Sequence, residues 1–517
     1  MGETMRNSIG RSVPEWANGN RLRPFNGLTA TPEVHRRAPA SLRVFPRGTP
    51  KLLRSIREGL DAACVRDGSV ISFHHHLRNG DAVANAVLSE AAAMGLRGLT
   101  VAASSIFPVH APWVELIRAG VISQIYTAYA AGPVADAVGR GALSSLMVMH
   151  THGGRARLIE SGDLRIDAAF VAAPTADAMG NLNGVQGPSA CGAMGYAFTD
   201  IAYASTVVAV TDNLVPYPAC PIAISQDFVD YVVPVASIGD RTQIVSGTTR
   251  PTDEPIGLEI AATAAKVIEA TDLLNENFGF QTGAGGISLA VAASLSDIML
   301  RKGVTGSFAA GGITGYLVDM LEKGLFRSLF DVQCFDLRAV DSFRDNPRHE
   351  AMSASMYANP WNKGAVVSQL SAMILGASEV DLDFNVNVTT ASDGRIIGGS
   401  GGHSDTAAGA ALAIVTTRLR AGLVPKIVER VRTATTPGQS IDVVVTEAGV
   451  AVNPLRPDIR DRLLSAGLRV VSIQHLFDLA SRGVEKREAS PSRSDDIVGI
   501  VEYRDGTVLD VIGRISE

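Results

Sequence analysis

The segment GFQTGAGGISLA, residues 279–290, joins a short apolar run to a run with helical spacing through a turn that contains Gly283, Gly285 and Gly286. Glycine is costly inside regular structure and is favoured where the backbone turns sharply or lies against a ligand. A strand that leads through such a turn into a helix is the opening half of a βαβ unit. The segment therefore predicts an α/β fold with a ligand held at this turn.

The same alternation recurs along the chain. SVISFHHHL (69–77) precedes the helical pattern DAVANAVLSEAAAMGL (81–96), and the second half starts again with GLEIAATAAKVIEA (257–270). Strands that alternate with helices predict mainly parallel sheets. Because the pattern lapses at 239–257, we predict two similar α/β lobes, at 51–250 and 251–517. The proline-rich residues 1–50 predict an irregular arm, and two alternating runs around Asp505-Gly506 predict a final hairpin.

The composition limits the class of protein. The 517 residues are 46% hydrophobic and 19% charged, with a formal net charge of −6, which suits a globular protein and gives no electrostatic basis for binding nucleic acid. The sequence has neither an apolar run long enough for a membrane span nor the apolar core of a secretion signal, so we expect a cytoplasmic protein. Its four cysteines form no Cys-x-x-Cys pair, which argues against a zinc site or a disulfide framework.

Three glycine turns follow expected strands in the second lobe: QTGAGGIS (281–288), AAGGITG (309–315) and IGGSGGHSD (397–405). The first turn is not a dinucleotide-binding fingerprint, because Ser288 stands where the third glycine belongs. A P-loop is excluded because the sequence contains no Gly-Lys dipeptide. Glycine turns that only connect strands to helices are one interpretation, and turns that bind a ligand are the other. Asp405, Asn385 and Asn387 border the third turn and are consistent with caps of helices or turns.

Further candidates for chemistry leave alternatives open. GGSGG (398–402) has the G-x-S-x-G spacing of a serine nucleophile, but an acid and then a histidine should follow Ser400, and His403 stands too close. In FHHHLRNGD (73–81), His74 and His76 face one way along a strand and His75 the other, so we predict no metal site. The histidines and Arg78 form either a structural polar cluster or a carboxylate site.

Glu276, just before the first turn, is either a nucleophile or base, or a solvated surface charge.

Several longer segments, including SFHHHLRNGD, NENFGFQTGAGGISLAVA, GGITGYLVDMLEKGL, GGSGGHSDTA and IDVVVTEAGVAVNPLRP, resemble the α chain of citrate lyase, the subunit that acts as citrate CoA-transferase. The resemblance runs from about residue 50 to the C-terminus and implies a CoA-transferase-like fold of two α/β lobes. In related CoA-transferases a glutamate attacks the thioester, and its place here falls at or beside Gly311. The resemblance therefore implies that this side-chain nucleophile is missing.

A substrate carboxylate can then act as the nucleophile, because it is already ionised at neutral pH and needs no general base. We expect citrate to attack an acetyl thioester on an acyl carrier protein, so that a mixed anhydride forms and citryl-carrier and acetate result. Backbone amides at glycine turns would stabilise the oxyanion. The residues assigned to catalysis, thioester contact or substrate binding are Gly311, Gly312, Gly283, Gly285, Gly286, Gly399, Gly401, Gly402, His403, His74, His75 and Arg78.

The resemblance also implies partners: a carrier (γ) subunit with a CoA-like thiol prosthetic group, a citryl-lyase (β) subunit, and further copies of this chain in one complex. This chain itself is expected to bind no cofactor. The alternatives are a CoA-transferase or acyl-CoA hydrolase for another small acid, such as citramalate, with a covalent Glu276, and a hydrolase with Ser400 as nucleophile.

Overall fold

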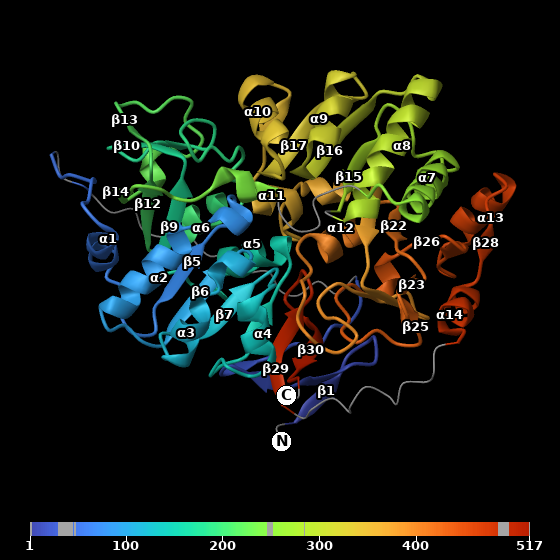
Figure 1. Ribbon diagram of the computed structural model, residues 1–517, viewed down its shortest axis with the longest axis horizontal. Coiled ribbons are helices and arrows are strands. Elements are labelled where there is room, and N and C mark those ends of the chain that lie inside the picture. Colours follow the sequence, from blue (N-terminus) through green and yellow to red (C-terminus); the bar gives the residue numbers. More distant parts are fainter. Residues whose placement is uncertain are drawn as a thin grey trace.

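The computed structural model describes residues 3–28, 45, 48–245, 252–283, 285–483 and 496–515. Figure 1 shows two α/β lobes side by side, the first in blue to green and the second in yellow to red. Within the described residues each lobe is built on a nine-stranded sheet. The predicted fold class, two similar α/β lobes with mainly parallel sheets, is confirmed.

The sheet of the first lobe has the strand order β14-β12-β9-β5-β6-β7-β8-β29-β30. All neighbours are parallel except the last pair, which is an antiparallel hairpin. The strands are β5 (Val70–Phe73), β6 (Leu99–Ala103), β7 (Ile122–Thr127), β8 (Met147–Met149), β9 (Ala168–Ala173), β12 (Thr206–Thr211), β14 (Tyr231–Pro234), β29 (Ile497–Glu502) and β30 (Val508–Gly513).

The sheet of the second lobe has the order β18-β17-β16-β15-β19-β22-β26-β27-β28. Its strands are β15 (Gly279–Thr282), β16 (Gly306–Ile313), β17 (Phe326–Cys334), β18 (His349–Ala351), β19 (Ala372–Gly376), β22 (Ala413–Thr416), β26 (Val443–Thr446), β27 (Gly449–Val452) and β28 (Val470–Val471). The path from β5 to β14 through the first sheet therefore matches the path from β15 to β26 through the second.

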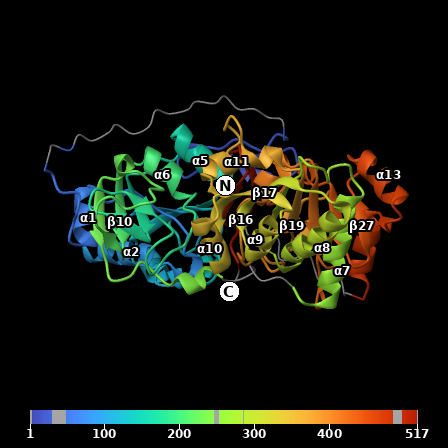
Figure 2. The ribbon, with the colours of Figure 1, turned by 90° about the horizontal axis from the view of Figure 1, so that it is seen from above.

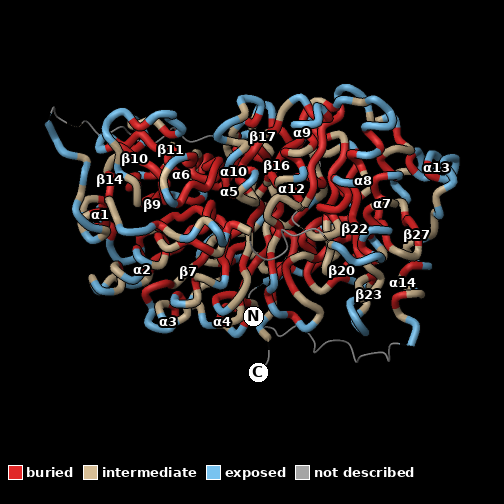
Figure 3. Tube along the Cα trace, turned by 45° about the horizontal axis from the view of Figure 1, so that its top comes forward, coloured by how far each residue is buried: buried red, intermediate tan, exposed pale blue. Residues whose placement is uncertain are grey.

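Helices follow the strands in the same order in both lobes. The first lobe has α1 (Ile56–Ala62), α2 (Val83–Ala93), α3 (Trp113–Arg118), α4 (Pro133–Gly139), α5 (His152–Ser161) and α6 (Ala197–Tyr203). The second has α7 (Pro255–Glu269), α8 (Gly286–Lys302), α9 (Gly315–Glu322), α10 (Leu337–Asp345), α11 (Ala354–Ala358), α12 (His403–Gly409), α13 (Pro457–Ser465) and α14 (Ile473–Ser481). Helices cover both faces, so central strands such as β6, β9 and β12 are buried along their whole length (Figure 3).

Each lobe also carries a small three-stranded sheet built around a buried aspartate. In the first it is β11 (Leu182–Asn183), β10 (Thr175–Asp177) and β13 (Leu214–Val215), and in the second β21 (Val386–Asn387), β20 (Glu379–Asp381) and β25 (Ile427–Val428). Asp177 accepts a hydrogen bond from the backbone of Asn181 at 3.1 Å, and Asp381 accepts one from the backbone of Asn385 at 2.8 Å. The two lobes thus repeat one design in detail.

The lobes meet through two equivalent pairs of backbone hydrogen bonds. The amide of Gly195 donates to Val332 O at 3.1 Å, and the carbonyl of Gly195 accepts from the amide of Ala354 at 2.9 Å. In the second pair Gly401 donates to Ala128 O at 3.0 Å and accepts from His152 at 2.8 Å. A glycine turn of each lobe is therefore seated on the other lobe, and α5 and α11 pack together at the junction (Figure 2).

The first residues of the chain and its C-terminal hairpin are arranged differently from the prediction. Residues of the expected irregular arm form short antiparallel pairs, β1 (Thr4–Arg6) with β2 (Ser12–Pro14) and β3 (Trp16–Ala17) with β4 (Asn20–Arg21). The predicted C-terminal hairpin forms, but it joins the first sheet beside β8 and not the lobe that precedes it in the sequence.

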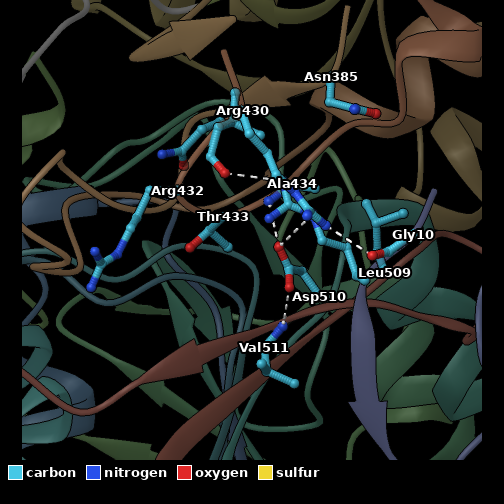
Figure 4. Close-up of polar contacts among 12 residues, drawn as sticks. Gly10, Asn385, Arg430, Arg432, Thr433, Ala434, Leu509, Asp510 and Val511 are labelled. Atoms are coloured by element: carbon cyan, nitrogen blue, oxygen red, sulfur yellow. Dashed lines mark hydrogen bonds and ion pairs between the residues drawn. The ribbon is translucent and has the colours of Figure 1, made fainter. Parts of the chain in front are cut away.

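Asp510 of this hairpin links the arm to the second lobe. Its carboxylate accepts a hydrogen bond from the Ala434 amide at 2.8 Å and lies 3.4 Å from Arg11, while Arg430 donates to Gly10 O at 2.8 Å (Figure 4). Both ends of the chain thus hold the lobes together. In the part of the chain that the structure describes, no helix has the length and apolar character of a membrane span.

Candidate active site

The three glycine turns converge at the carboxyl ends of β15 and β16 and the start of α12. Gln281, at the end of β15, donates from its side-chain amide to the Tyr357 hydroxyl at 2.7 Å. A Cβ atom at Gly311 would lie 2.4 Å from the Gln281 amide nitrogen, and a Cβ at Gly402 would lie 2.4 Å from the same hydroxyl. One hydrogen-bonded pair of side chains thus fills the space between the second and third turns.

Gly311 and Gly312, where the resemblance led us to expect that a nucleophilic glutamate is missing, leave little room for a side chain. Gly311 has a φ of +103°, which disfavours any residue with a Cβ. A Cβ at Gly312 would lie 2.2 Å from the ring of Phe335. The backbone conformation therefore favours glycine at position 311, and the Phe335 ring occupies the space that a side chain at position 312 would need.

The first turn lies beside the end of β19. The Gly283 amide donates to Ile374 O at 2.7 Å, and α8 begins directly after the turn at Gly286, with Gly285 as its N-cap. Among the described residues no side chain caps this helix. The backbone amides in the first turn of helix α8, together with the positive end of its helix dipole, therefore suit an anion.

The third turn is wedged against the first lobe. A Cβ at Gly399 would lie 2.3 Å from Ala128 O, and one at Gly401 would lie 3.4 Å from Nε2 of His152. His403 begins α12, with Nε2 2.9 Å from Gly376 O and Nδ1 2.7 Å from the Thr436 hydroxyl. Since a carbonyl only accepts, Nε2 carries the proton in this network. His403 fixes the turn to the end of β19, and both of its ring nitrogens are engaged.

His75 is the histidine of the FHHHLRNGD cluster that faces this junction. Its Nδ1 lies 2.5 Å from the Ser104 hydroxyl, and its ring stacks on His152 at 5.8 Å and lies 4.5 Å from the ring of Tyr196. Burial holds the pKa of His75 well below its usual range and lowers that of His152 to about 3. Both imidazoles are therefore neutral at pH 7.

Arg78 brings a positive charge to the same place. Its guanidinium lies 5.1 Å from the ring centre of Phe107 and 4.9 Å from that of Phe335, so aromatic rings of both lobes flank it. Such cation–π contacts stabilise a planar guanidinium. Burial lowers the pKa of Arg78 to about 10, which leaves the group charged at pH 7. Its φ of +53° is rare for a residue with a side chain and is typical of functional sites.

His74 lies in a separate buried cluster. Its Nδ1 is 3.8 Å from the carboxylate of Asp200, which Arg155 pairs at 2.5 Å. Burial and the charge of Arg155 lower the pKa of His74 to about 3. The structure thus places His74 behind the site, not beside His75 and Arg78.

Glu276 and Ser400 are not placed for nucleophilic attack. The Glu276 side chain is 77% exposed, precedes the amino end of β15 and lies 3.8 Å from Arg327, whereas the glycine turn follows the carboxyl end of that strand. The Ser400 hydroxyl accepts from the Ser404 amide at 3.3 Å, while His403 is bound to Gly376 and Thr436. This placement favours the surface-charge interpretation of Glu276 and argues against the serine hydrolase.

Sequence reasoning missed several residues of the site, namely Gln281, Tyr357, His152, Tyr196, Phe107 and Phe335. Within the described residues, Oε1 of Gln281 and Nδ1 of His152 are buried without a hydrogen-bond partner. A buried, unsatisfied polar atom costs about 1–3 kcal/mol, so these atoms suit a polar ligand. His152 starts the helix after β8 in MHTHGG (149–154), a signal that the sequence did contain. No group of three or more His, Cys, Asp or Glu in the described chain is arranged to hold a metal ion.

Comparison with known proteins decides the family. The model of the family described as citrate lyase, alpha subunit, matches residues 49–515. The chain belongs to the citrate lyase alpha subunit family. The citrate lyase alpha chains of Klebsiella pneumoniae and Escherichia coli are 43% and 45% identical to it, covering 99% and 90% of this chain and 99% and 91% of their own lengths.

Solved structures agree with this family. A crystal structure from Streptococcus mutans, described as the alpha subunit of citrate lyase in complex with citrate, matches with a TM-score of 0.94 and 42% identity, over 99% of this chain and 100% of that one. A malonate decarboxylase alpha subunit from Acinetobacter baumannii has a TM-score of 0.62 at 14% identity, over 83% and 92% of the two chains, which shows a shared fold alone. The sequence-based prediction of a citrate CoA-transferase subunit is thus confirmed.

Proposed function

We propose that this citrate lyase alpha subunit exchanges the acetyl group of an acetyl-carrier thioester for a citryl group without attaching an acyl group to its own side chains. A citrate carboxylate oxygen attacks the thioester carbonyl carbon, the carbon–sulfur bond breaks, and the carrier thiolate leaves. The thiolate then attacks the citryl carbonyl of the bound citric-acetic anhydride, and acetate leaves. Atoms and charges balance without a cofactor or metal.

The exclusion of side chains at Gly311 and Gly312 carries this proposal. A nucleophile at either position would need the space of Gln281 or Phe335. With no protein nucleophile there, the incoming carboxylate must reach the thioester itself. Holding two reactants in attack geometry contributes roughly 7–11 kcal/mol, which makes such a route competitive.

The charges around the junction support an acidic substrate. Arg78 is a charged group beside neutral His75 and His152, so a citrate carboxylate at this place would meet a cation and polar ring nitrogens. The uncapped start of α8 adds amide donors for the second carboxylate or the oxyanion. The solved relative from Streptococcus mutans was crystallised with citrate, which supports a tricarboxylate acceptor.

The remaining assignments complete the proposal. The thioester belongs to a carrier subunit with a CoA-like thiol group, a citryl-lyase subunit consumes the citryl-carrier, and several copies of this chain work in one cytoplasmic complex. Gly283, Gly285 and Gly286 contact the thioester, and Gly399, Gly401 and Gly402 line the side of the carrier arm. His403 supports that side through Gly376 and Thr436.

Isotope exchange tests the proposal. Purified chain is incubated with acetyl-carrier and labelled acetate, in the presence and absence of citrate or citramalate. We expect label to enter the acetyl-carrier and citrate to yield citryl-carrier. Exchange with citramalate in place of citrate would revise the substrate, and the absence of any acyl exchange would contradict the proposal.

A further inference from the structure

Asp405 lies where three distant segments of the chain meet. It is fully buried in the first turn of α12, as the last residue of the third glycine turn. Its carboxylate accepts hydrogen bonds from the Thr151 hydroxyl at 2.9 Å and the Gly153 amide at 2.8 Å, and Nε of Arg504 lies 3.5 Å away. A carboxylate of the second lobe therefore reaches the start of α5 in the first lobe, next to the C-terminal hairpin.

The chain is shaped to admit this carboxylate. Gly153 lacks a Cβ atom that would lie 2.8 Å from Oδ1 of Asp405 and 2.0 Å from Ala358 O. Thr151 is the N-cap of α5, because its hydroxyl also accepts from the Gly154 amide at 2.8 Å. Asp405 thus serves as a second acceptor for the helix that carries His152.

The residues held in this way belong to the site. His152 stands between Thr151 and Gly153, its amide donates to Gly401 O at 2.8 Å, and its ring lies 4.6 Å from the ring of Tyr196. Asp405 lies four residues after Gly401 and binds Thr151 and Gly153, the two neighbours of His152. Its hydrogen bonds therefore fix the third glycine turn and His152 relative to each other across the lobe junction.

The charge of Asp405 depends on its surroundings. Burial raises its pKa to about 6, while Arg504 and the hydrogen bonds from Gly153 and Thr151 oppose this rise. The other titratable groups near it are His152, which stands between its two donors on α5, His403 on its own helix α12, and three phenols. The phenols are Tyr196 before α6, Tyr357 on α11 and Tyr503 on the hairpin, and burial raises the pKa of each. The histidines have lowered pKa values, so Arg504 is the cation that balances the carboxylate among these groups.

We propose that Asp405 is a positioning residue for acyl transfer: it holds the third glycine turn and His152 in register across the two lobes without touching substrate. This inference rests on the proposed site at the lobe junction. It predicts that loss of the carboxylate slows the chemical step more than it weakens citrate binding. In Asp405→Asn the side-chain NH2 group would point toward the Thr151 hydroxyl or the Gly153 amide, which are themselves donors. We therefore expect at least one of these two hydrogen bonds to be lost.

The test compares kcat and the KM for citrate of wild type, Asp405→Asn, Thr151→Val and Thr151→Ser in the exchange assay, from about pH 5 to about pH 8. Asp393→Asn is the matched control, because Asp393 lies in the loop before α12 but is exposed and paired with Arg395. We expect Asp405→Asn to lower kcat by roughly tenfold to a hundredfold, with KM changed less than about threefold, since small displacements in a site have effects of this size. We expect kcat of wild type to fall as the pH drops through about 6, where Asp405 gains a proton, and we expect Asp405→Asn to lack this fall.

Thr151→Val, which removes one donor to Asp405, should lower kcat in the same direction, and Thr151→Ser should restore it. If Asp405→Asn does not fold, as judged by thermal melting, this Thr151 pair decides the matter. The inference is overturned if kcat of folded Asp405→Asn stays within about twofold of wild type, or if its pH profile superimposes on the wild-type profile. If Asp405→Asn does not fold, a Thr151→Val enzyme with kcat within about twofold of Thr151→Ser overturns the inference. An inactive wild type would contradict the proposed function instead.

Discussion

The side-chain amide of Gln281 is hydrogen-bonded to the hydroxyl of Tyr357 at 2.7 Å, and this pair stands between the glycines of two turns. Gly311 on one side and Gly402 on the other have no room for a Cβ atom because of it. The relationship explains why glycines gather here: their backbone is packed against polar side chains that line the junction of the lobes. Each of the following predictions tests one part of that arrangement.

Gly311→Ala should abolish most of the exchange activity and destabilise the protein by about 1–3 kcal/mol, since a Cβ at this φ is strained and meets Gln281. Urea unfolding and the exchange assay measure the two effects. Gly303→Ala is the control, because Gly303 also has a positive φ of +64° but has no atom within 4 Å of the added Cβ. Equal activity in the two variants would show that Gly311 matters only for its conformation.

Tyr357→Phe should destabilise the fold by roughly 1–3 kcal/mol, because the buried amide of Gln281 loses its acceptor. Exchange activity should fall as well, since Gln281 is then free to turn toward the substrate. Tyr316→Phe, at a residue that is 41% exposed, provides the control. A Tyr357→Phe enzyme with normal stability and normal kcat would show that the Gln281–Tyr357 hydrogen bond is needed neither for the fold nor for the reaction.

Arg78→Lys should weaken citrate binding by about tenfold or more, because lysine keeps the charge but loses the planar stack between Phe107 and Phe335 and the bidentate fork. Calorimetric titration with citrate measures this loss, and Arg97→Lys at the surface is the control. Unchanged citrate affinity would place the tricarboxylate elsewhere.

His74→Gln should make stability less dependent on acid pH. The folded-state pKa of His74, about 3, lies below its ordinary value, so the neutral form is favoured in the native state. The contribution of neutral His74 to the free energy of unfolding is fully present above about pH 6.5. Between about pH 6.5 and about pH 3, about 1.4 kcal/mol of it is lost for each pH unit, because the unfolded chain takes up a proton that the folded chain does not. Urea unfolding of wild type, His74→Gln and the exposed control His475→Gln should show this slope. If the free energy of unfolding depends on pH equally in all three proteins, the lowered pKa of His74 is contradicted.

The sequence allowed the fold class and the glycine turns to be predicted because both depend on local pattern. Strand–turn–helix periodicity is local, and it correctly indicated two similar lobes. The C-terminal hairpin was recognised from Asp505-Gly506, yet its place beside β8 depends on a pairing across more than the length of a lobe, which no local pattern records.

The site divides in the same way. His75 and Arg78 could be proposed from their cluster, but which of the adjacent histidines faces the junction depends on the register of β5. Gln281 and Tyr357 meet only because β15 and the helix α11 approach each other in three dimensions. Asp405 has the sequence position of an ordinary helix cap, and only its contact with Thr151 of the first lobe shows otherwise. Chemistry assembled between lobes is therefore the part that a single sequence conceals.

The most direct test of the account is to trap an acyl-enzyme during turnover. Wild type and Glu276→Gln are incubated with acetyl-carrier, treated with borohydride or hydroxylamine, and examined by peptide mass spectrometry. The account predicts no modified residue in either protein and equal exchange rates for both. A stable adduct on any side chain, at Glu276 or elsewhere, would contradict it.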